Sequence, residues 1–149
     1  SALVMTRAVI AGENIVIQSA AEKVLSSTEF RLRGQKTHPW VSRGGVKLAH
    51  AVEHFGVDLN GAIAVDVGCS HGGFTDVLLH NGASKVYAVD VGYGQLDLKL
   101  RNDERVVVLE RTNARHLTSE LIPDTPSIVV CDASFIPLSK VLPAALKLC

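Results

Sequence analysis

A short apolar run near the middle of the chain ends in an acidic residue and a bend rich in glycine. The segment reads Asp66-Val67-Gly68-Cys69-Ser70-His71-Gly72-Gly73-Phe74, and a helical pattern starts near Phe74. Glycines let a backbone adopt positive φ angles and pass close to a ligand. The helix that follows presents unpaired N–H groups to whatever lies in the bend. Residues of these types in this order are suited to holding a nucleoside-type cofactor.

An acidic residue at the end of the next apolar run narrows the choice of cofactor. Asp90 lies twenty-two residues after Gly68, and a carboxylate there can accept both hydroxyl groups of a ribose. The same arrangement serves NAD, but the bend lacks the G-x-G-x-x-G pattern that holds a pyrophosphate. An acidic bend instead suits a cofactor with a cationic centre and an amino-acid tail, which is S-adenosylmethionine. Asp66 would orient the bend and bind near the amino group.

Polar residues also follow the third and fourth apolar runs. Thr112 and Asn113 come after the third run, where the adenine should lie, and an amide can both donate and accept hydrogen bonds. Asn113 could equally be a turn residue, and Asp90 a surface charge. Asp132 follows the fourth run and should face the reacting group, although it could instead cap a helix that begins near Pro137.

Lys47 is the second candidate for chemistry. An ammonium group close to Asp132 could position and deprotonate a ribose hydroxyl if burial or neighbouring cations lowered its pKa. The alternative is a solvated lysine in the first turn of a helix. No metal ligands are predicted.

These side chains need strands and helices that bring them together. Apolar runs predict four strands, at 62–67, 86–89, Val106–Leu109 and Ile128–Cys131. Helical spacing predicts a helix that Ser42 caps and Gly56 ends, a second from Phe74 to a stop at Gly82, and a third that is short and reaches Leu100. A fourth helix over 138–146 closes the chain, and Pro143 can kink it. Apolar strands that alternate with helices predict a parallel sheet covered on both faces, with ligands at the carboxyl ends of the strands.

Composition limits the class of protein. The chain has 149 residues, of which 47% are hydrophobic, enough for one core and a small extra module. It shows neither a run long enough to span a bilayer nor a signal peptide. Three cysteines without framework spacing favour a reducing, cytoplasmic setting, and Cys69 and Cys131 are expected to be packing residues.

The net charge of zero hides an asymmetry between the two ends of the chain. Residues 1–50 carry a net charge of +4 and residues 51–149 one of −4. The basic residues cluster between 31 and 47, with His38 and Trp40 among them, which could bind a polyanion such as RNA or could form a solvated strand face. Short β-like runs over 11–33 are too few for an independent core, and 34–41 is typical of a linker.

Five ordered motifs carry a resemblance to a known family. The first two are Val41-Ser42-Arg43-Gly44-Gly45-Val46-Lys47-Leu48 and Asp66-Val67-Gly68-Cys69-Ser70-His71-Gly72-Gly73-Phe74-Thr75-Asp76-Val77-Leu78-Leu79. The other three are Tyr87-Ala88-Val89-Asp90-Val91-Gly92-Tyr93-Gly94-Gln95-Leu96, Leu109-Glu110-Arg111-Thr112-Asn113-Ala114-Arg115 and Asp132-Ala133-Ser134-Phe135-Ile136. The chain resembles the TlyA, or haemolysin A-like, family of S-adenosylmethionine-dependent ribosomal RNA 2′-O-methyltransferases, whose catalytic domain is FtsJ-like. The resemblance implies an α/β, Rossmann-like methyltransferase fold with an incomplete, mostly parallel sheet over 42–149. It also implies a partial alpha-L RNA-binding module over 1–33, with 34–41 as the linker.

The resemblance assigns roles to individual residues. The family's first catalytic Lys matches Lys47 and its catalytic Asp matches Asp132. The residues implied in cofactor binding are Asp66, Gly68, Cys69, Ser70, His71, Gly72, Gly73, Phe74, Asp90, Val91, Thr112, Asn113, Ala114 and Asp132. Those implied in RNA binding are Arg31, Arg33, Lys36 and Arg43. Family members use a Lys-Asp-Lys-Glu tetrad whose second Lys and Glu have no match here, so the chain is expected to be truncated at both ends and to have little activity alone.

Several functions therefore stay open at the level of sequence. The first is 2′-O-methylation of ribosomal RNA, with cytidine as the implied target and ribosomal subunits as partners. A membrane-active haemolysin, an RNA-binding module without chemistry and, last, an NAD dehydrogenase are the alternatives. A homodimer could form across an unpaired sheet edge.

Overall fold

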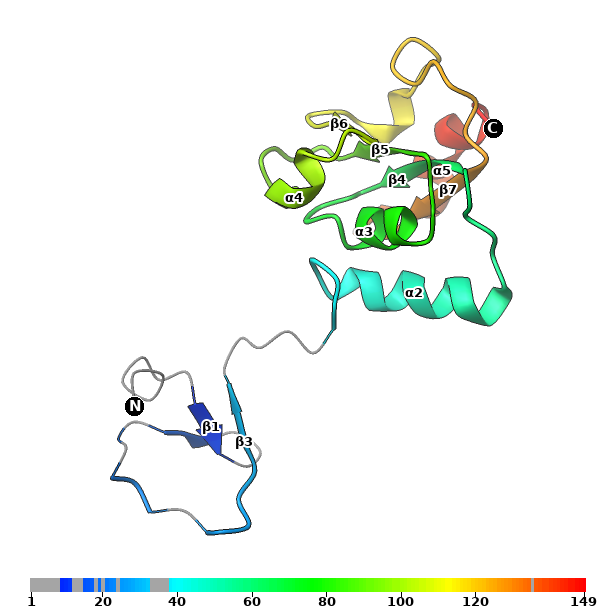
Figure 1. Cartoon of the computed structure of the whole chain (residues 1–149). Helices are drawn as coiled ribbons and strands as arrows, with labels where there is room; N and C mark the ends of the chain where they lie inside the picture. The colour runs from blue at the N-terminus through cyan, green and yellow to red at the C-terminus, as the bar shows by residue number, and fades with distance from the viewer. Residues whose placement is uncertain are drawn as a thin grey trace. The chain divides into compact units, whose positions relative to one another are not determined.

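A computed structural model describes residues 9–11, 15–17, 19, 21–23, 25–32, 38–134 and 136–149. The chain forms two compact units, Ser1–Pro39 and Trp40–Cys149. The division falls inside the linker expected at 34–41. Figure 1 shows the elements of each unit.

The smaller unit contains one antiparallel sheet. Its strands are β1 (Val9–Ala11), β2 (Ile15–Val16) and β3 (Phe30–Leu32), in the order β2-β1-β3. Ala11 pairs with Ile15 on one side and with Phe30 on the other. Ala11 and Ile17 are buried, whereas the Phe30 side chain is largely exposed. The described part of this unit thus buries little apolar surface.

The larger unit is built on a four-stranded parallel sheet in the order β6-β5-β4-β7. Its strands are β4 (Ile63–Val67), β5 (Lys85–Val89), β6 (Val106–Leu109) and β7 (Ile128–Cys131), within a residue of the predicted bounds. The register pairs Val67 with both Val89 and Cys131, and Val89 with Leu109. All four strands therefore end at the same level, and the residues after them meet at one edge of the sheet.

Helices cover both faces of this sheet, as predicted. On one face α2 (Gly44–Phe55) packs against α3 (Gly73–His80), and α4 (Leu98–Arg101) adds Leu100 to the same core. On the other face α5 (Leu138–Leu146) and the short 3-10 helix η1 (Ala114–His116) pack together. Successive strand residues point to opposite faces, so Ala64 joins the first core and Val65 the second. Both cores are apolar layers that hold the strand ends in place, and Figure 1 shows the helices beside the sheet.

The ends of α2 show where the prediction held and where it was wrong. Gly56 ends the helix as predicted, with φ of +60°, and its N–H bonds back to Val52 and Glu53. The prediction that Ser42 caps the helix is wrong, because the cap position is Arg43 and no side chain caps it. Ser42 accepts a bond from Gly45 N–H through its backbone carbonyl instead, 3.1 Å away. Its hydroxyl lies against α3, where a Cβ on Gly73 would sit 2.3 Å from Ser42 Oγ.

The second predicted helix stops at Gly82, as expected. α3 stops at His80, and Asn81 follows as its C-cap, with Asn81 Nδ2 donating to the Val77 carbonyl at 2.8 Å. Gly82 comes next with φ of +95°, the left-handed conformation that glycine tolerates best. Gly82 N–H donates to the Leu79 carbonyl at 3.2 Å and Ala83 N–H to the Leu78 carbonyl at 3.0 Å, so the left-handed glycine ends the helix as predicted.

Replacing Gly73 with alanine should destabilise the larger unit. The added Cβ would lie 2.6 Å from the Gly45 backbone nitrogen, which cannot move without shifting α2. Overpacking of this kind costs about 1–3 kcal/mol of unfolding free energy, measured by urea denaturation. Gly44→Ala is the matched control, because its Cβ would meet nothing closer than 3.4 Å. Equal stability of the two variants would contradict the close approach of α2 and α3.

Candidate cofactor and catalytic site

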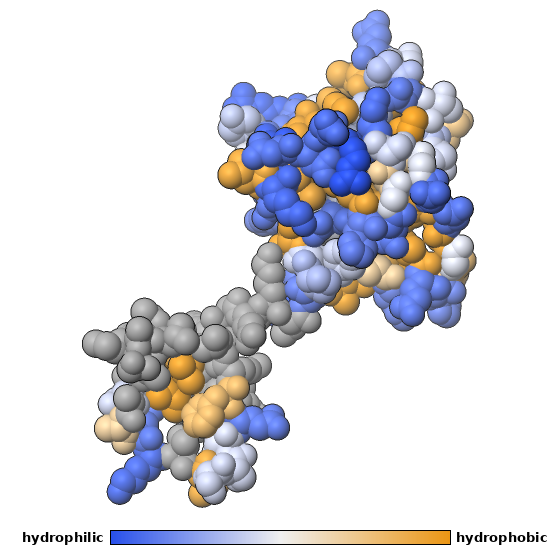
Figure 2. Space-filling view, in the orientation of Figure 1, coloured by the Kyte–Doolittle hydropathy of each residue, from blue (hydrophilic) through white to orange (hydrophobic). Residues whose placement is uncertain are grey.

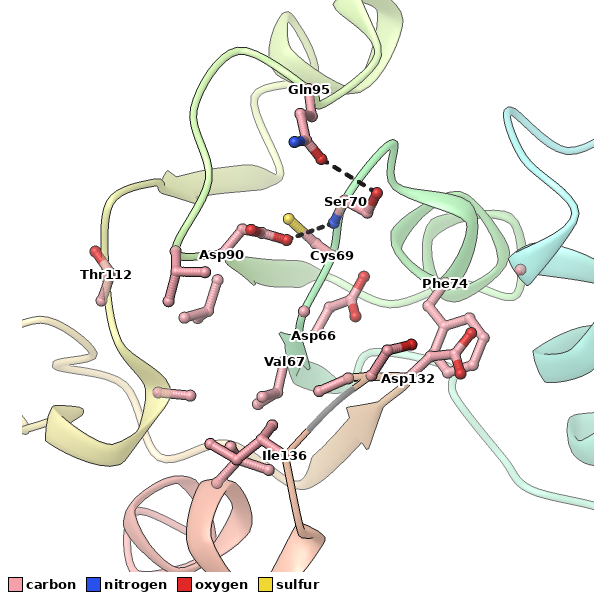
Figure 3. A pocket seen from close by; sticks show the side chains of 18 of the residues that line it. Asp66, Val67, Cys69, Ser70, Phe74, Asp90, Gln95, Thr112, Asp132 and Ile136 are labelled. Carbon is pink, nitrogen blue, oxygen red and sulfur yellow. Dashed lines mark hydrogen bonds between the residues drawn. The ribbon is translucent and has the colours of Figure 1, made fainter.

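A cavity of about 820 Å³ opens at the edge of the sheet where the four strands end. Figure 3 shows side chains from the loops after β4, β5, β6 and β7 around it. Twelve of the predicted cofactor residues line it: Asp66, Gly68, Cys69, Ser70, Gly73, Phe74, Asp90, Val91, Thr112, Asn113, Ala114 and Asp132. The structure therefore brings most of the predicted set together around one space.

The bend after β4 follows the backbone of β5 closely. Gly68 and Cys69 both donate their N–H groups to the Val89 carbonyl, at 2.9 and 3.1 Å. Gly68 has φ of +79° and Ser70 has φ of +47°, so the turn uses left-handed backbone even at a residue with a side chain. The turn directs the Ser70 N–H toward the loop after β5.

Asp90 connects that bend to the loop after β5. Asp90 Oδ2 accepts from Ser70 N–H at 2.8 Å, and Asp90 Oδ1 accepts from Gly92 N–H at 2.7 Å. The carboxylate faces the bend in Figure 3 and lines the cavity. Each oxygen has a second lone pair, so both can still accept a hydrogen bond from a ligand.

Asp66 lies at the floor of the cavity and is 1% exposed. Its Oδ2 accepts from Thr75 N–H at 3.0 Å and from Thr75 Oγ1 at 2.7 Å. Among the described residues, none donates to its Oδ1. Burial raises the pKa of Asp66 to about 7, the two bonds from Thr75 oppose that rise, and the charges of Asp90 and Asp132 add to it. A buried carboxylate with an oxygen left over suits a cationic ligand group.

Lys47 and Asp132 form an ion pair beside the cavity. Lys47 Nζ lies 2.8 Å from Asp132 Oδ2 and 3.0 Å from Asp132 Oδ1. The side chains are 66% and 43% exposed, so the pair adds little to stability. The helix-cap alternative for Asp132 is wrong, because Pro137 occupies the cap position of α5. As in the solvated-lysine alternative, Lys47 lies in the first turn of α2 and is largely exposed, and its ammonium is also paired with the Asp132 carboxylate.

After β6, Asn113 combines the two roles that the sequence left open, a ligand contact and a turn residue. Asn113 lines the cavity, and its Oδ1 also accepts from Arg115 N–H at 3.0 Å to cap η1. Its amide nitrogen stays available to a ligand. Glu110 turns away instead, because it accepts from Gly94 N–H at 2.9 Å and pairs with Arg101. The bond from Gly94 fastens the loop after β5 to the end of β6, and the ion pair with Arg101 fastens α4 there.

The cysteines near the strand ends behave as packing residues. Cys69 is buried, and desolvation, with the nearby carboxylates of Asp66 and Asp90, raises the pKa of its thiol. Burial also raises the pKa of Cys131. Both thiols therefore stay protonated and weakly nucleophilic at neutral pH.

Some predicted residues lie elsewhere. His71 and Gly72 belong to the bend but do not line the cavity: His71 accepts from Asp97 N–H through its carbonyl, and Gly72 leaves room for Leu100, whose Cδ1 would be 2.3 Å from a Cβ there. Arg43 is exposed at the start of α2. Arg31 lies in β3, and only its backbone is described; Arg33 and Lys36 lie outside the described residues.

The cavity also has walls that the sequence reasoning missed. Gln95 reaches the bend from the loop after β5, where Ser70 Oγ donates to its Oε1 at 3.4 Å (Figure 3). Apolar side chains complete the wall near β7 and α5. The residues not predicted are Ser42, Gly44, Val67, Val89, Gln95, Ala133, Ser134, Ile136 and Val141. All of them except Val141 carried a signal, because they belong to the motifs on which the family resemblance rests.

The parallel sheet, the glycine bend and the carboxylates at successive strand ends define a Rossmann-like methyltransferase fold. The profile of the FtsJ-like methyltransferase family matches residues 40–149. The chain belongs to the FtsJ-like methyltransferase family.

The chain is also similar to individual proteins in sequence and in structure. The 16S/23S rRNA (cytidine-2′-O)-methyltransferase TlyA of Mycobacterium tuberculosis is 52% identical over 83% of this chain and 46% of its own length. Hemolysin A of Brachyspira hyodysenteriae is 50% identical over 72% of this chain and 45% of its own. A solved structure named "Putative hemolysin from Streptococcus thermophilus" superposes with a TM-score of 0.73 at 42% identity, covering 97% of this chain and 53% of that one. The chain spans about half the length of the curated relatives it matches. Within its described part, no helix has the length and apolar content needed to cross a membrane.

Proposed function

We propose that this chain is the cofactor-binding part of an S-adenosylmethionine-dependent methyltransferase that modifies ribosomal RNA on a 2′-hydroxyl, with cytidine as the target nucleotide, in the cytoplasm. The observation that carries the proposal is the Lys47–Asp132 pair beside a cavity lined by Asp66 and Asp90. The names of the TlyA relatives support the choice of RNA and of cytidine.

The residues around the cavity fit S-adenosylmethionine in type. Asp66 keeps one oxygen for an ammonium group, and Asp90 keeps lone pairs for ribose hydroxyls. Thr112, Asn113 and the exposed side chain of Val91 offer polar and apolar contacts for a base at the end of β6 and β5. A volume of about 820 Å³ is within the range of cofactor pockets. When bound, the cofactor would supply a methyl group activated by a sulfonium.

Lys47 and Asp132 would act on the target nucleotide. The Asp132 carboxylate can accept a hydrogen bond from the 2′-hydroxyl, and the Lys47 ammonium next to it can hold the oxygen in line with the methyl group. Positioning of this kind accounts for a large share of the rate in a transfer between two bound partners. The family tetrad suggests that a second Lys and a Glu assist them; two of the four groups lie in this chain. Arg31, Arg33, Lys36 and Arg43 are proposed to bind RNA.

The proposal predicts that the folded 149-residue chain binds S-adenosylhomocysteine but transfers methyl groups poorly. Isothermal titration should show one site per chain, because the described cavity walls come from this chain alone. Tritium transfer from S-adenosylmethionine to bacterial ribosomal subunits should stay near background, since only Lys47 and Asp132 of the tetrad are supplied.

A thermal melt of the same sample is the control for folding. A folded chain without affinity for S-adenosylhomocysteine would contradict the proposed cofactor. Rapid methyl transfer would contradict the need for the other two tetrad groups.

A further inference from the structure

The outward face of α2 carries a line of basic side chains. Arg43, Lys47, His50 and His54 follow one another at spacings of four, three and four residues, and all four are exposed. Such spacing places them in one narrow stripe along the helix. The stripe is defined here as these four residues.

The opposite face of α2 is the one that packs. Gly45 and Leu48 are buried there, with Ala49 and Val52 against the same core. The stripe is therefore not needed to hold the helix on α3. The only carboxylate of α2, Glu53, lies outside the stripe at a helical position on its flank. In Figure 2 the lower edge of the larger unit, where α2 runs in Figure 1, shows hydrophilic residues interrupted by hydrophobic ones.

The charge of the stripe differs from that of the unit that carries it. Residues 40–149 contain ten Lys and Arg against twelve Asp and Glu. Lys85, Lys99, Arg101 and Arg105 are each paired with a carboxylate. Within the described part of the chain, Arg43 has no ion-pair partner. Because the unit as a whole is slightly acidic, a polyanion would be attracted only to local groups of cations, and the stripe is one such group.

The far end of the stripe is aromatic. The His50 and His54 rings lie nearly parallel with centroids 5.8 Å apart, and the Phe55 ring meets His54 edge-on at 4.7 Å. Phe55 is 75% exposed. Three neighbouring rings on the surface offer flat faces on which unpaired bases can stack, and single-stranded nucleic acids are commonly bound by such rings beside cations.

The near end of the stripe is the proposed catalytic site. Lys47 contacts Asp132, and His54 follows seven residues later, about 10 Å further along the helix. That distance corresponds to a few nucleotides of a single strand. A strand whose target ribose lies at Lys47 and Asp132 could thus reach the rings with a neighbouring base.

We propose that the outer face of α2, together with the exposed Phe55 ring at the end of this helix, is an RNA track: Arg43 and Lys47 hold the backbone at the target nucleotide, and His50, His54 and Phe55 stack an unpaired base a few nucleotides away. This inference rests on the proposed function, because it starts from the Lys47–Asp132 pair as the place of the target ribose. Its occupant is single-stranded or looped RNA, not duplex RNA, whose bases are already stacked.

Fluorescence anisotropy with a labelled twelve-nucleotide oligouridine tests the track on the whole chain. Phe55→Leu, which keeps an apolar side chain but removes the ring, should weaken binding about 5- to 20-fold. Phe55→Tyr should bind like the parent, since it keeps the ring. Arg43→Gln should lower the slope of log affinity against log salt by roughly 0.7, whereas Phe55→Leu should leave the slope unchanged. Leu146→Ala, an exposed apolar residue on α5, is the distant control.

The outcomes separate this inference from the proposed function. Equal affinities of Phe55→Leu, Phe55→Tyr and the parent for oligouridine would overturn the track, and so would a folded parent that does not bind oligouridine. The track would also be overturned if Phe55→Leu lost as much affinity for a twelve-base-pair RNA duplex as for oligouridine. Calorimetry with S-adenosylhomocysteine on the same variants reports on the cofactor site independently. Loss of oligouridine binding in Phe55→Leu without any cofactor binding by the parent would keep the RNA track and contradict the methyltransferase proposal.

Discussion

Asp90→Asn should reduce the affinity for S-adenosylhomocysteine more than 100-fold. The carboxylate accepts N–H groups from both Ser70 and Gly92, and each oxygen has a lone pair left for a ribose hydroxyl. An amide in its place would turn an NH₂ group toward one of these donors and would lose the charge. Hydrogen bonds to a charged acceptor contribute about 1.5–3 kcal/mol each, so losing two corresponds to at least a hundredfold.

Isothermal titration with S-adenosylhomocysteine measures this effect. Asp97→Asn is the matched control, because Asp97 lies in the same loop but caps α4 by accepting from Lys99 N–H, a role that asparagine fills equally well. The control should bind like the parent. If Asp90→Asn remains folded and also binds like the parent, Asp90 does not hold the ribose.

The second large effect concerns pH and Asp66. Its pKa in the folded chain is about 7, against 3.8 for an ordinary aspartate, so the folded state holds a proton that the unfolded state has released. The free energy of unfolding should therefore fall as pH rises from about 4 to 7, by about 1.4 kcal/mol per unit and about 4 kcal/mol in all from this group. Below pH 4 both states are protonated, and its contribution is then fully present.

Urea denaturation at several pH values from 4 to 8 measures the slope. Asp66→Asn is the control, because its amide oxygen can still accept the two bonds from Thr75 but cannot titrate. The parent should lose more stability than the variant over this range. Parallel curves for the two proteins would show that Asp66 is ionised throughout.

Ligand binding should show the opposite dependence on pH. If the ammonium of the cofactor faces Asp66, the carboxylate must be ionised to bind it, so affinity should rise with pH up to about 7 and flatten above. Titration of the parent with S-adenosylhomocysteine at the same pH values measures this dependence. The affinity of Asp66→Asn should not change with pH over this range.

The sheet and most of the cavity could be predicted because their signals are local in sequence. In a parallel sheet the residue after each strand arrives at the same edge, so the order of Gly68, Asp90 and Asp132 along the chain already indicates that they meet. Apolar runs also gave the strand positions, since strands buried on both faces contain few polar residues. These inferences need no knowledge of which side chains touch.

Other features depend on contacts between segments far apart in the chain. Ser42 was predicted to cap α2 but packs against α3 instead, because Gly73 lets α3 approach it closely. No pattern near residue 42 reveals this contact. His71 was expected at the ligand but turns its carbonyl to Asp97, and Glu110 pairs with Arg101 across two loops. Arg43 and Lys47 were visible in sequence as basic residues, but the exposed His50 and His54 in line with them and the ring contacts of His54 were not.

The two backbone N–H groups that hold Asp90 affect how fast a ligand can bind. Ser70 and Gly92 fix the rotamer of this carboxylate before any ligand arrives. A ligand therefore loses no entropy in ordering that side chain, and preorganisation of this kind raises affinity without adding contacts. Binding should accordingly need no slow rearrangement of the Asp90 side chain.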